Sequence, residues 1–310
     1  MESSARTGSA PSGDQWRISA AGHEAVLVEV GGGLREYQCQ GVPVVDGYAE
    51  DAIAPYGAGH ILAPWPNRIR DGRYTFDGQD HQLPLTEPAR HNAIHGLVNW
   101  VPWIRTEHTV DSVCLDYRLA PRPGYPWPLA MRTQWSVGSN GLRADHVVTN
   151  LGATTAPFGF GVHPYVRIPG VTLDDTTLTM PAQSRVLVDA RLLPIGMAKV
   201  TGGPFDFAAG RRIGGAELDT AYGDLIPVDG EAAGSEVVLS GGGRSITVWA
   251  DAHFRWWQLF TSDPLPDERR RRAIAVEPMT CPPDAFRSRR DLIELAPGET
   301  WRASWGIRPS

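Results

Sequence analysis

The stretch Val113–Leu119, VCLDYRL, places apolar side chains at every second position. The positions between them hold Cys114, Asp116 and Arg118, so the two faces of the segment differ in polarity. A period of two is that of a β-strand with one buried face. The same alternation, or a β-branched and aromatic composition, recurs in four further stretches, namely Val26–Val30, Arg244–Ala250, Trp256–Phe260 and Trp301–Ile307.

Turn residues separate these stretches at short intervals. Clusters rich in glycine and proline stand at 31–33, 139–141, 202–204, 241–243 and 297–298, and the 310 residues include 34 glycines and 26 prolines. Many short strands with frequent turns and no sustained helical period predict an all-β sandwich or barrel. Because no linker, repeat or change of composition divides the chain, we expect one domain over residues 15–310. The small, polar residues 1–14 are expected to form a disordered tail.

Composition excludes several classes of protein. The net charge of −6 argues against a nucleic-acid partner. Lys199 is the single lysine, which argues against covalent catalysis through lysine. Three widely spaced cysteines without a CxxC pair fit a reducing compartment. No apolar leader and no run long enough to span a bilayer is present, so we expect a cytoplasmic protein, monomer or homodimer, with no membrane partner.

His163 is the first candidate for chemistry. It lies in PFGFGVHPYV (157–166), after a Gly-aromatic-Gly run and before Pro164, which favours an extended backbone at the histidine. Glycines beside a rigidly held histidine indicate a cleft. A histidine that only makes one hydrogen bond at the end of a strand is the alternative.

Two loops carry the next candidates. In GAGHILAPWPNRIRDG (57–72), Pro64 and Pro66 exclude a helix and a central strand, so we expect an ordered loop that presents Asn67 and Arg68. Arg68 would bind sugar hydroxyls or an anion, or else brace the loop. In HNAIHG (91–96), the spacing of the two histidines resembles that of a zinc pair, but no HExxH glutamate lies between them and we expect no metal.

His95 therefore appears as a second imidazole beside a glycine, with tryptophans nearby that either stack on a sugar or fill the core.

Two carboxylates complete the set of candidate site residues. Glu277 ends the apolar run Ala273–Val276, where burial would raise its pKa toward values suited to a general base. Asp219, between Leu218 and Thr220, could accept hydrogen bonds from substrate hydroxyls.

These motifs together resemble one family. LAPWPNRI (62–69), AIHG (93–96), GVHPY (161–165), LD (218–219) and VEPMT (276–280), in this order and at these separations, are similar to the aldose 1-epimerase (galactose mutarotase) family over nearly the whole chain. The resemblance implies a single-domain β-supersandwich of the galactose mutarotase-like type, with a sugar cleft and no cofactor.

The resemblance also implies roles for the residues. By the motif match, His163 is the general acid and Glu277 the general base. Arg68, His95 and Asp219 bind and orient the sugar, with Asn67 beside them as a further binding group. The match at Asp219 rests on Leu-Asp alone. The segment EPMTCPPDAF (277–286) is closer to one bacterial branch than to the galactose enzymes, which leaves the preferred aldose open.

The implied reaction suits these residues. To interconvert α and β aldoses, a base removes the proton of the anomeric hydroxyl and an acid protonates the ring oxygen. The ring opens to the aldehyde, the C1–C2 bond rotates, and the ring closes on the other face. One acid and one base are sufficient, each typically worth about 10²–10⁴-fold, and no metal or nucleotide is required. We expect an isomerase acting on free aldohexoses. The alternatives are a hexose-6-phosphate 1-epimerase, for which Arg70, Arg73 and Arg90 would bind the phosphate, and a non-catalytic sugar-binding module.

Overall fold

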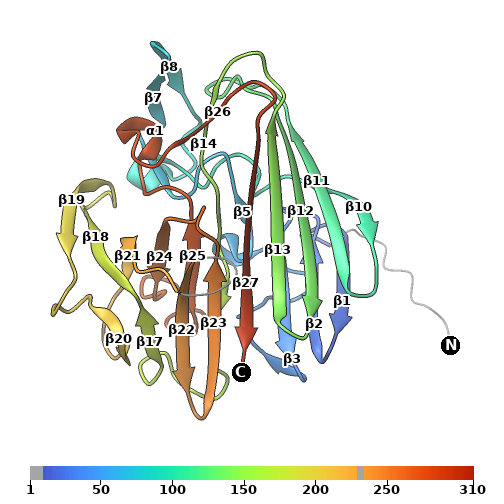
Figure 1. The fold of residues 1–310 in the computed structure, drawn as a ribbon, viewed down its shortest axis with the longest axis vertical. Coiled ribbons are helices and arrows are strands. Elements are labelled where there is room, and N and C mark those ends of the chain that lie inside the picture. The colour runs from blue at the N-terminus through green and yellow to red at the C-terminus, as the bar shows by residue number, and fades with distance from the viewer. Residues whose placement is uncertain (1–9, 229–233) are drawn as a thin grey trace.

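The computed structural model describes residues 10–228 and 234–310 and consists almost entirely of antiparallel β-strands (Figure 1). A nine-stranded sheet has the order β10 (Ile104–His108), β11 (Ser112–Leu119), β12 (Leu129–Gly138), β13 (Gly141–Asn150), β27 (Thr300–Pro309), β23 (Arg244–Ala250), β22 (Ser235–Gly241), β17 (Thr177–Met180) and β20 (Phe207–Arg212). A four-stranded sheet contains β1 (Gln15–Ala20), β2 (His23–Val28), β3 (Leu34–Cys39) and β4 (Val42–Pro43).

An eight-stranded sheet lies behind β22 and β23 in Figure 1. Its order is β19 (Pro194–Lys199), β18 (Ala182–Val188), β21 (Asp219–Leu225), β24 (Trp256–Phe260), β25 (Ile274–Met279), β15 (Gly161–Val162) and β5 (Ile61–Leu62), and β16 (Tyr165–Val166) also pairs with β25.

Three small ribbons and short helices complete the fold. The ribbons pair β6 (Arg68–Arg70) with β9 (Asn92–Ile94), β7 (Arg73–Phe76) with β8 (Gln79–Gln82), and β14 (Ala156–Phe158) with β26 (Ile293–Leu295). The helices are α1 (Ala285–Ser288) and two 3₁₀ turns at Pro55–Gly57 and Pro88–Arg90. Among residues 10–228 and 234–310, no helix is long and apolar enough to cross a membrane.

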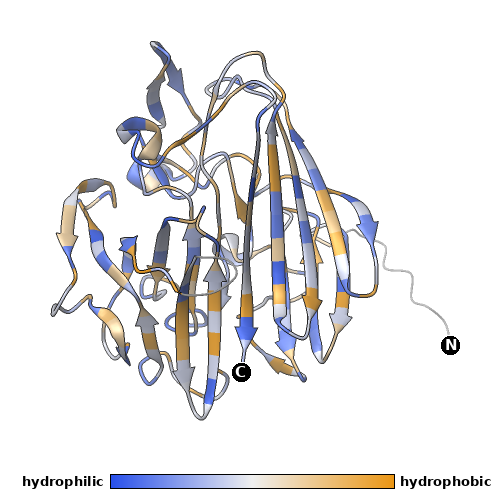
Figure 2. Ribbon diagram, in the orientation of Figure 1, coloured by the Kyte–Doolittle hydropathy of each residue, from blue (hydrophilic) through white to orange (hydrophobic). Residues whose placement is uncertain are grey.

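The alternation of VCLDYRL is that of a strand inside a sandwich. Val113, Leu115 and Leu119 are buried, and the colour bands along β11, β12 and β13 in Figure 2 show apolar and polar residues following one another. The largest hydrophobic cluster contains side chains from Trp16 to Ile307, so both ends of the described chain enter one core. The all-β sandwich expected from the sequence is confirmed.

Residues 10–14 of the predicted tail are folded. Residues 1–9 lie outside the described residues, but Ser12 is 2% exposed and its carbonyl accepts a 3.0 Å hydrogen bond from the N–H of Val30. The N–H of Glu29 likewise donates to the carbonyl of Asp14 at 2.9 Å. Residues 10–14 therefore belong to the folded part, and the predicted tail of residues 1–14 is too long at this end.

Candidate active site

The candidate catalytic residues lie in one row across the eight-stranded sheet. Glu277 on β25 pairs with Gln258 on β24, and Gln258 pairs in turn with Ala221 on β21. On the other side of β25, Gly161 pairs with Met279 and Tyr165 with Ala275, so the intervening His163 lies opposite Glu277. Residues opposite one another on antiparallel strands project from the same face, with Cβ atoms about 4.5–5.5 Å apart. The register of the sheet therefore brings the predicted acid and base together.

The side chains of this pair meet below the surface. Nε2 of His163 lies 3.5 Å from Oε1 of Glu277, and the residues are 5% and 2% exposed. The ring of Tyr165 stacks on that of His163 with centroids 5.0 Å apart. Among the described residues, neither Nδ1 of His163 nor Oε2 of Glu277 has a hydrogen-bond partner. Oε2 of Glu277 thus keeps hydrogen-bonding capacity for a substrate, and Nδ1 of His163 keeps it for a further partner.

Burial moves the pKa values of the two groups in opposite directions. Removal from water lowers the pKa of His163 to about 4, and the charge of Arg68 acts in the same direction. The pKa of Glu277 is raised well above its usual value, first by burial and then by the negative charge of Asp219, while Arg68 opposes this. Burial therefore favours the uncharged form of both groups, the imidazole of His163 and the carboxylic acid of Glu277.

Arg68 is fixed by a carboxylate from outside the motifs. Nε and Nη2 of Arg68 donate to the two oxygens of Glu87 at 2.9 and 3.0 Å, which is a bidentate ion pair. Arg90 and Asn92 also donate to Glu87. Burial of Glu87 works against its ionisation, but these hydrogen bonds and charges outweigh it and lower its pKa. Arg68 is thus held in place by Glu87, and its charge affects both His163 and Glu277.

His95 faces His163 edge-on, with ring centroids 5.3 Å apart. Its Nδ1 accepts a 3.2 Å hydrogen bond from the backbone N–H of Asn67, so the neutral ring carries its proton on Nε2 and is a donor there. The pKa of His95 is lowered well below its usual value, mainly by burial and then by the charges of His163 and Arg68. His95 is therefore a neutral hydrogen-bond donor beside the acid.

Asn67 mainly holds the loop together. Its Oδ1 accepts from the N–H of Arg68 at 2.9 Å, its carbonyl accepts from the N–H of His95, and its backbone has a positive φ of 54°.

Gly96 also has a positive φ, and a Cβ there would lie 2.0 Å from the carbonyl oxygen of Ala63. The glycine of the AIHG motif is thus required for the contact that joins ribbon β6–β9 to the loop before it.

Asp219 is the first residue of β21. It contacts Gln258, which pairs with Glu277 and which the sequence analysis did not indicate as a site residue. Nε2 of Gln258 donates to Oδ1 of Asp219 at 2.5 Å. Burial raises the pKa of Asp219, with the charge of Arg68 acting against it. Gln258 is 3% exposed, and its signal in the sequence is a lone amide within the apolar run WWQLF. All six predicted site residues are thus connected with one another.

One detail of the sequence interpretation changes, namely the role of the glycines around His163. A Cβ at Gly159 would lie 2.6 Å from Sγ of Cys281, and one at Gly161 would lie 2.9 Å from Cβ of Pro66. These glycines therefore allow close packing of the proline-rich loop and do not line a substrate space. His91 is exposed and contacts Asp71, so it separates from His95, and no group of three or more metal-ligating side chains occurs in the described part of the chain.

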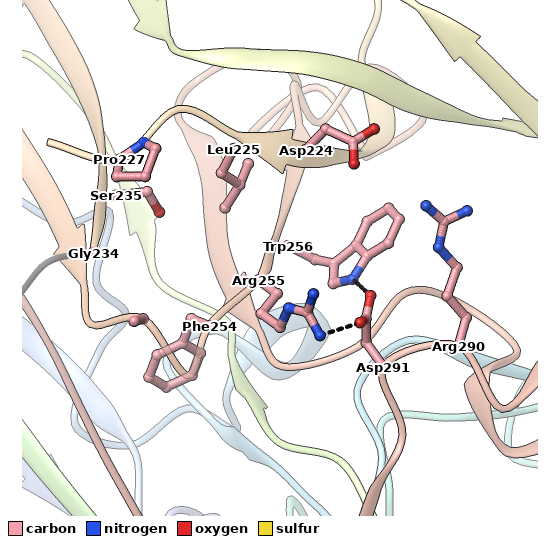
Figure 3. A pocket seen from close by; sticks show the side chains of 11 residues that line it. Asp224, Leu225, Pro227, Gly234, Ser235, Phe254, Arg255, Trp256, Arg290 and Asp291 are labelled. Carbon is pink, nitrogen blue, oxygen red and sulfur yellow. Dashed lines mark hydrogen bonds and ion pairs between the residues drawn. The ribbon is translucent and has the colours of Figure 1, made fainter.

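A separate hollow of about 400 Å³ is lined by Trp256, which lies two residues along β24 from Gln258 (Figure 3). The indole N–H of Trp256 donates to Asp291 at 2.9 Å, and Arg255 pairs with the same carboxylate. These polar groups satisfy one another. Because neither His163 nor Glu277 lines this hollow, it is not the site of the acid–base chemistry.

The chain matches a known protein family over nearly its whole length. The family model described as aldose 1-epimerase matches residues 14–308. The chain is 32% identical over 300 residues to YihR of Escherichia coli (strain K12), a protein of uncharacterised function, covering 96% of this chain and 93% of that protein. Galactose mutarotase of Rattus norvegicus is 27% identical over 178 residues, which cover 54% of this chain and 48% of the rat protein.

Solved structures show the same fold. The GalM/aldose epimerase homologue of C. elegans superposes with a TM-score of 0.83 at 20% identity, covering 96% of this chain and 98% of that one. Galactose 1-epimerase of Lactobacillus acidophilus NCFM has a TM-score of 0.75 at 21% identity, with coverage of 94% and 92%. The fold is thus the galactose mutarotase-like β-sandwich, and the chain belongs to the aldose 1-epimerase family.

Proposed function

We propose that this protein interconverts the α and β anomers of a free aldohexose, with His163 as general acid and Glu277 as general base. The observation that carries the proposal is the buried contact of 3.5 Å between Nε2 of His163 and Oε1 of Glu277. Two groups at this separation can both reach the C1–O5 region of one sugar ring, where the anomeric hydroxyl and the ring oxygen share a carbon. Membership of the aldose 1-epimerase family supports sugar epimerisation in general.

The proton movements balance within the pair. Glu277 takes the proton of the anomeric hydroxyl while His163 gives its Nε2 proton to the ring oxygen, and the C1–O5 bond breaks to leave the open-chain aldehyde. Rotation about C1–C2 presents the other face of the carbonyl, and the reverse transfers close the ring. The pair begins as carboxylate and imidazolium, becomes carboxylic acid and imidazole during the open-chain stage, and ends as it began.

Burial assists this sequence. The lowered pKa of His163 and the raised pKa of Glu277 both favour the uncharged pair, which is the form that accompanies the aldehyde. The charged pair needed at the start is favoured by the bound sugar, because a hydrogen bond from the anomeric hydroxyl stabilises the carboxylate. The buried environment therefore lowers the cost of ring opening, the step that breaks a covalent bond.

The other predicted residues would hold the sugar. Arg68 is a fixed donor, Nε2–H of His95 is a neutral donor, and Asp219 is an acceptor oriented by Gln258. These groups match the alternating donors and acceptors that vicinal hydroxyls require.

The arginines named for phosphate binding are occupied elsewhere. Arg70 lies 3.9 Å from Asp189, Arg73 donates to Gln82 at 2.7 Å, and Arg90 pairs with Glu87 at 3.0 Å. A phosphate carries about two negative charges at neutral pH and is normally met by several uncommitted cations. This distribution supports a free aldose over a hexose 6-phosphate.

Anomer exchange measured by NMR saturation transfer tests the proposal. Equilibrated glucose, galactose and glucose 6-phosphate are each examined with wild-type protein and with the His163→Asn variant. We expect faster exchange of at least one free sugar, and loss of that effect in the variant. Binding without exchange would instead indicate a non-catalytic sugar-binding module, and acceleration of the phosphate alone would indicate the phosphorylated substrate.

A further inference from the structure

The catalytic row continues one strand beyond His163. Ile61 and Leu62 of β5 pair with Val162 and Gly161 of β15, which places His60 opposite His163. The N–H of His163 donates to the carbonyl of His60 at 3.1 Å. His60 and Glu277 are therefore the two cross-strand neighbours of His163, one on each side, and all three project from the same face of the sheet.

Two glycines and a tryptophan surround the ring of His60. The residue is 0% exposed. Gly31 and Gly33 lie against the ring, where a Cβ would come within 2.6 and 3.1 Å of Cδ2 of His60. Trp100 lies edge-on to the ring, with centroids 4.7 Å apart, and covers it on the side of the solvent. The fold thus encloses this imidazole closely.

The hydrogen-bonding state of His60 is unusual for a buried polar group. Neither Nδ1 nor Nε2 has a hydrogen-bond partner among residues 10–228 and 234–310. Buried polar atoms in native proteins are nearly always satisfied by protein or by ordered water. Nδ1 of the neighbouring His163 is buried in the same condition. Two adjacent imidazoles in one row thus both require a partner.

A positive charge on His163 would disfavour a positive charge on His60. The pKa of His60 is lowered to about 3, mainly by burial and also by the positive charge that His163 would carry. His60 is therefore neutral whenever His163 takes part in catalysis, and one of its nitrogens is an acceptor. A neutral acceptor next to His163 can stabilise an N–H group on Nδ1.

We propose that His60 is a positioning residue for His163, acting through one buried water molecule that accepts from Nδ1–H of His163 and donates to a ring nitrogen of His60. This arrangement keeps a proton on Nδ1 of His163 in both its charged and its neutral form. Nε2, which faces Glu277, is then the nitrogen that gives and takes back the catalytic proton. The inference rests on the proposed function for its consequence in catalysis, but the hydrogen-bond pattern exists without any sugar.

The first test is the ¹⁵N NMR spectrum of histidine-labelled wild-type protein, with the His163 signals assigned by their loss in His163→Asn. We expect His163 to carry hydrogen on Nδ1 throughout the range in which the protein is folded. A neutral His163 with hydrogen on Nε2 alone would overturn the proposal. Because no substrate is needed, this result is independent of whether the proposed function is correct.

The second test compares two substitutions at the same position. His60→Leu removes both ring nitrogens, whereas His60→Asn keeps an acceptor and a donor. We expect kcat to fall at least tenfold in the leucine variant with KM changed less than threefold, and to recover to within a few-fold of wild type in the asparagine variant. The ¹⁵N pattern of His163 should move toward the Nε2–H form in the leucine variant alone.

Thermal unfolding separates this role from a structural one. Leucine needs no hydrogen-bond partner in this enclosed position, so we expect the melting temperature to change little, and lost activity would then not reflect lost folding. Wild-type kcat together with a wild-type ¹⁵N pattern in the leucine variant would contradict the proposal. If the leucine variant does not fold, the wild-type spectrum and the asparagine variant still decide the question.

Discussion

Glu277 and His163 face each other across β25 and β15, with Oε1 and Nε2 3.5 Å apart and both side chains withdrawn from solvent. The contact is not made by flexible loops, because the register of paired strands determines it. Four predictions follow from how the pair and its surroundings are built.

Glu277→Gln should reduce the catalysed rate of anomer exchange by about 10²–10⁴-fold, because the amide has nearly the same shape but cannot take the proton of the anomeric hydroxyl. Saturation-transfer NMR measures the rate, and titration calorimetry should show that the sugar still binds. Glu294→Gln, at an exposed glutamate paired with Arg289, is a matched control and should behave as wild type. The double variant with His163→Asn should be little worse than either single variant, since both groups serve one step. Multiplicative losses would count against a shared step.

The pH dependence of kcat/KM should report a pair that works with one proton. As pH falls past the pKa of His163, about 4, His163 becomes protonated while Glu277 is already protonated. The pair then holds two protons, and neither group can act as the base. As pH rises past the elevated pKa of Glu277, the last proton leaves and no acid remains. We therefore expect an acid limb near pH 4 and an alkaline limb well above the usual carboxyl range. A catalysed rate that is constant over the whole pH range in which the protein is folded would exclude this pair.

Glu87→Gln should weaken substrate binding more than chemistry. The substitution removes the charge that fixes Arg68, so the guanidinium loses its bidentate partner and its orientation toward the sugar. We expect KM to rise roughly tenfold with a smaller change in kcat. Arg90→Gln is the control, because Arg90 contacts the same carboxylate from a more exposed position, and its KM should stay within about twofold of wild type. Equal effects of the two substitutions would show that Arg68 is not held through Glu87.

The free energy of unfolding should fall steadily as the solution becomes acidic. Burial lowers the pKa of His60 and of His146 to about 3, below their usual value of 6.5. Between these values the unfolded chain binds protons that the folded chain does not, so stability is lost as pH decreases through this window. Each histidine contributes a slope of at most about 1.4 kcal/mol per pH unit.

Urea unfolding between pH 6.5 and 4.5 measures this slope. In His146→Gln one titrating group is gone, and the slope should decrease by about one proton. His146 contacts the hydroxyl of Thr133 and accepts from the indole N–H of Trp305, so the variant will also be less stable at every pH. The contribution of His146 would be refuted by an unchanged slope, whatever the absolute stability.

The strands and the main site residues could be predicted from the sequence because their signals are local. VCLDYRL alternates within seven residues, and His163, Glu277 and Arg68 each stand in a short motif. What could not be predicted depends on pairing between distant segments. Glu87 is 19 residues from Arg68, and Gln258 joins Asp219 across 39.

The glycines around His163 show the same limit. Gly159 and Gly161 looked like the lining of a substrate space, but the atoms that require them are in Cys281 and Pro66, on segments far away in the chain. His60 had no signal of its own, since its role depends on which residue of β15 lies opposite it. The alternation of apolar and polar residues can be recognised within one stretch of sequence. Strand register and packing partners cannot, because they depend on two distant stretches.

The contact between Gly96 and Ala63 has a consequence for how this enzyme could be redesigned. Arg68 and His95 are carried by ribbon β6–β9, whereas His163 and Glu277 belong to the large sheet. A Cβ at position 96 would lie 2.0 Å from the carbonyl oxygen of Ala63, so any residue larger than glycine forces these two segments apart. A substitution at position 96 therefore alters the distance between the two proposed sugar-binding residues and the proposed acid–base pair.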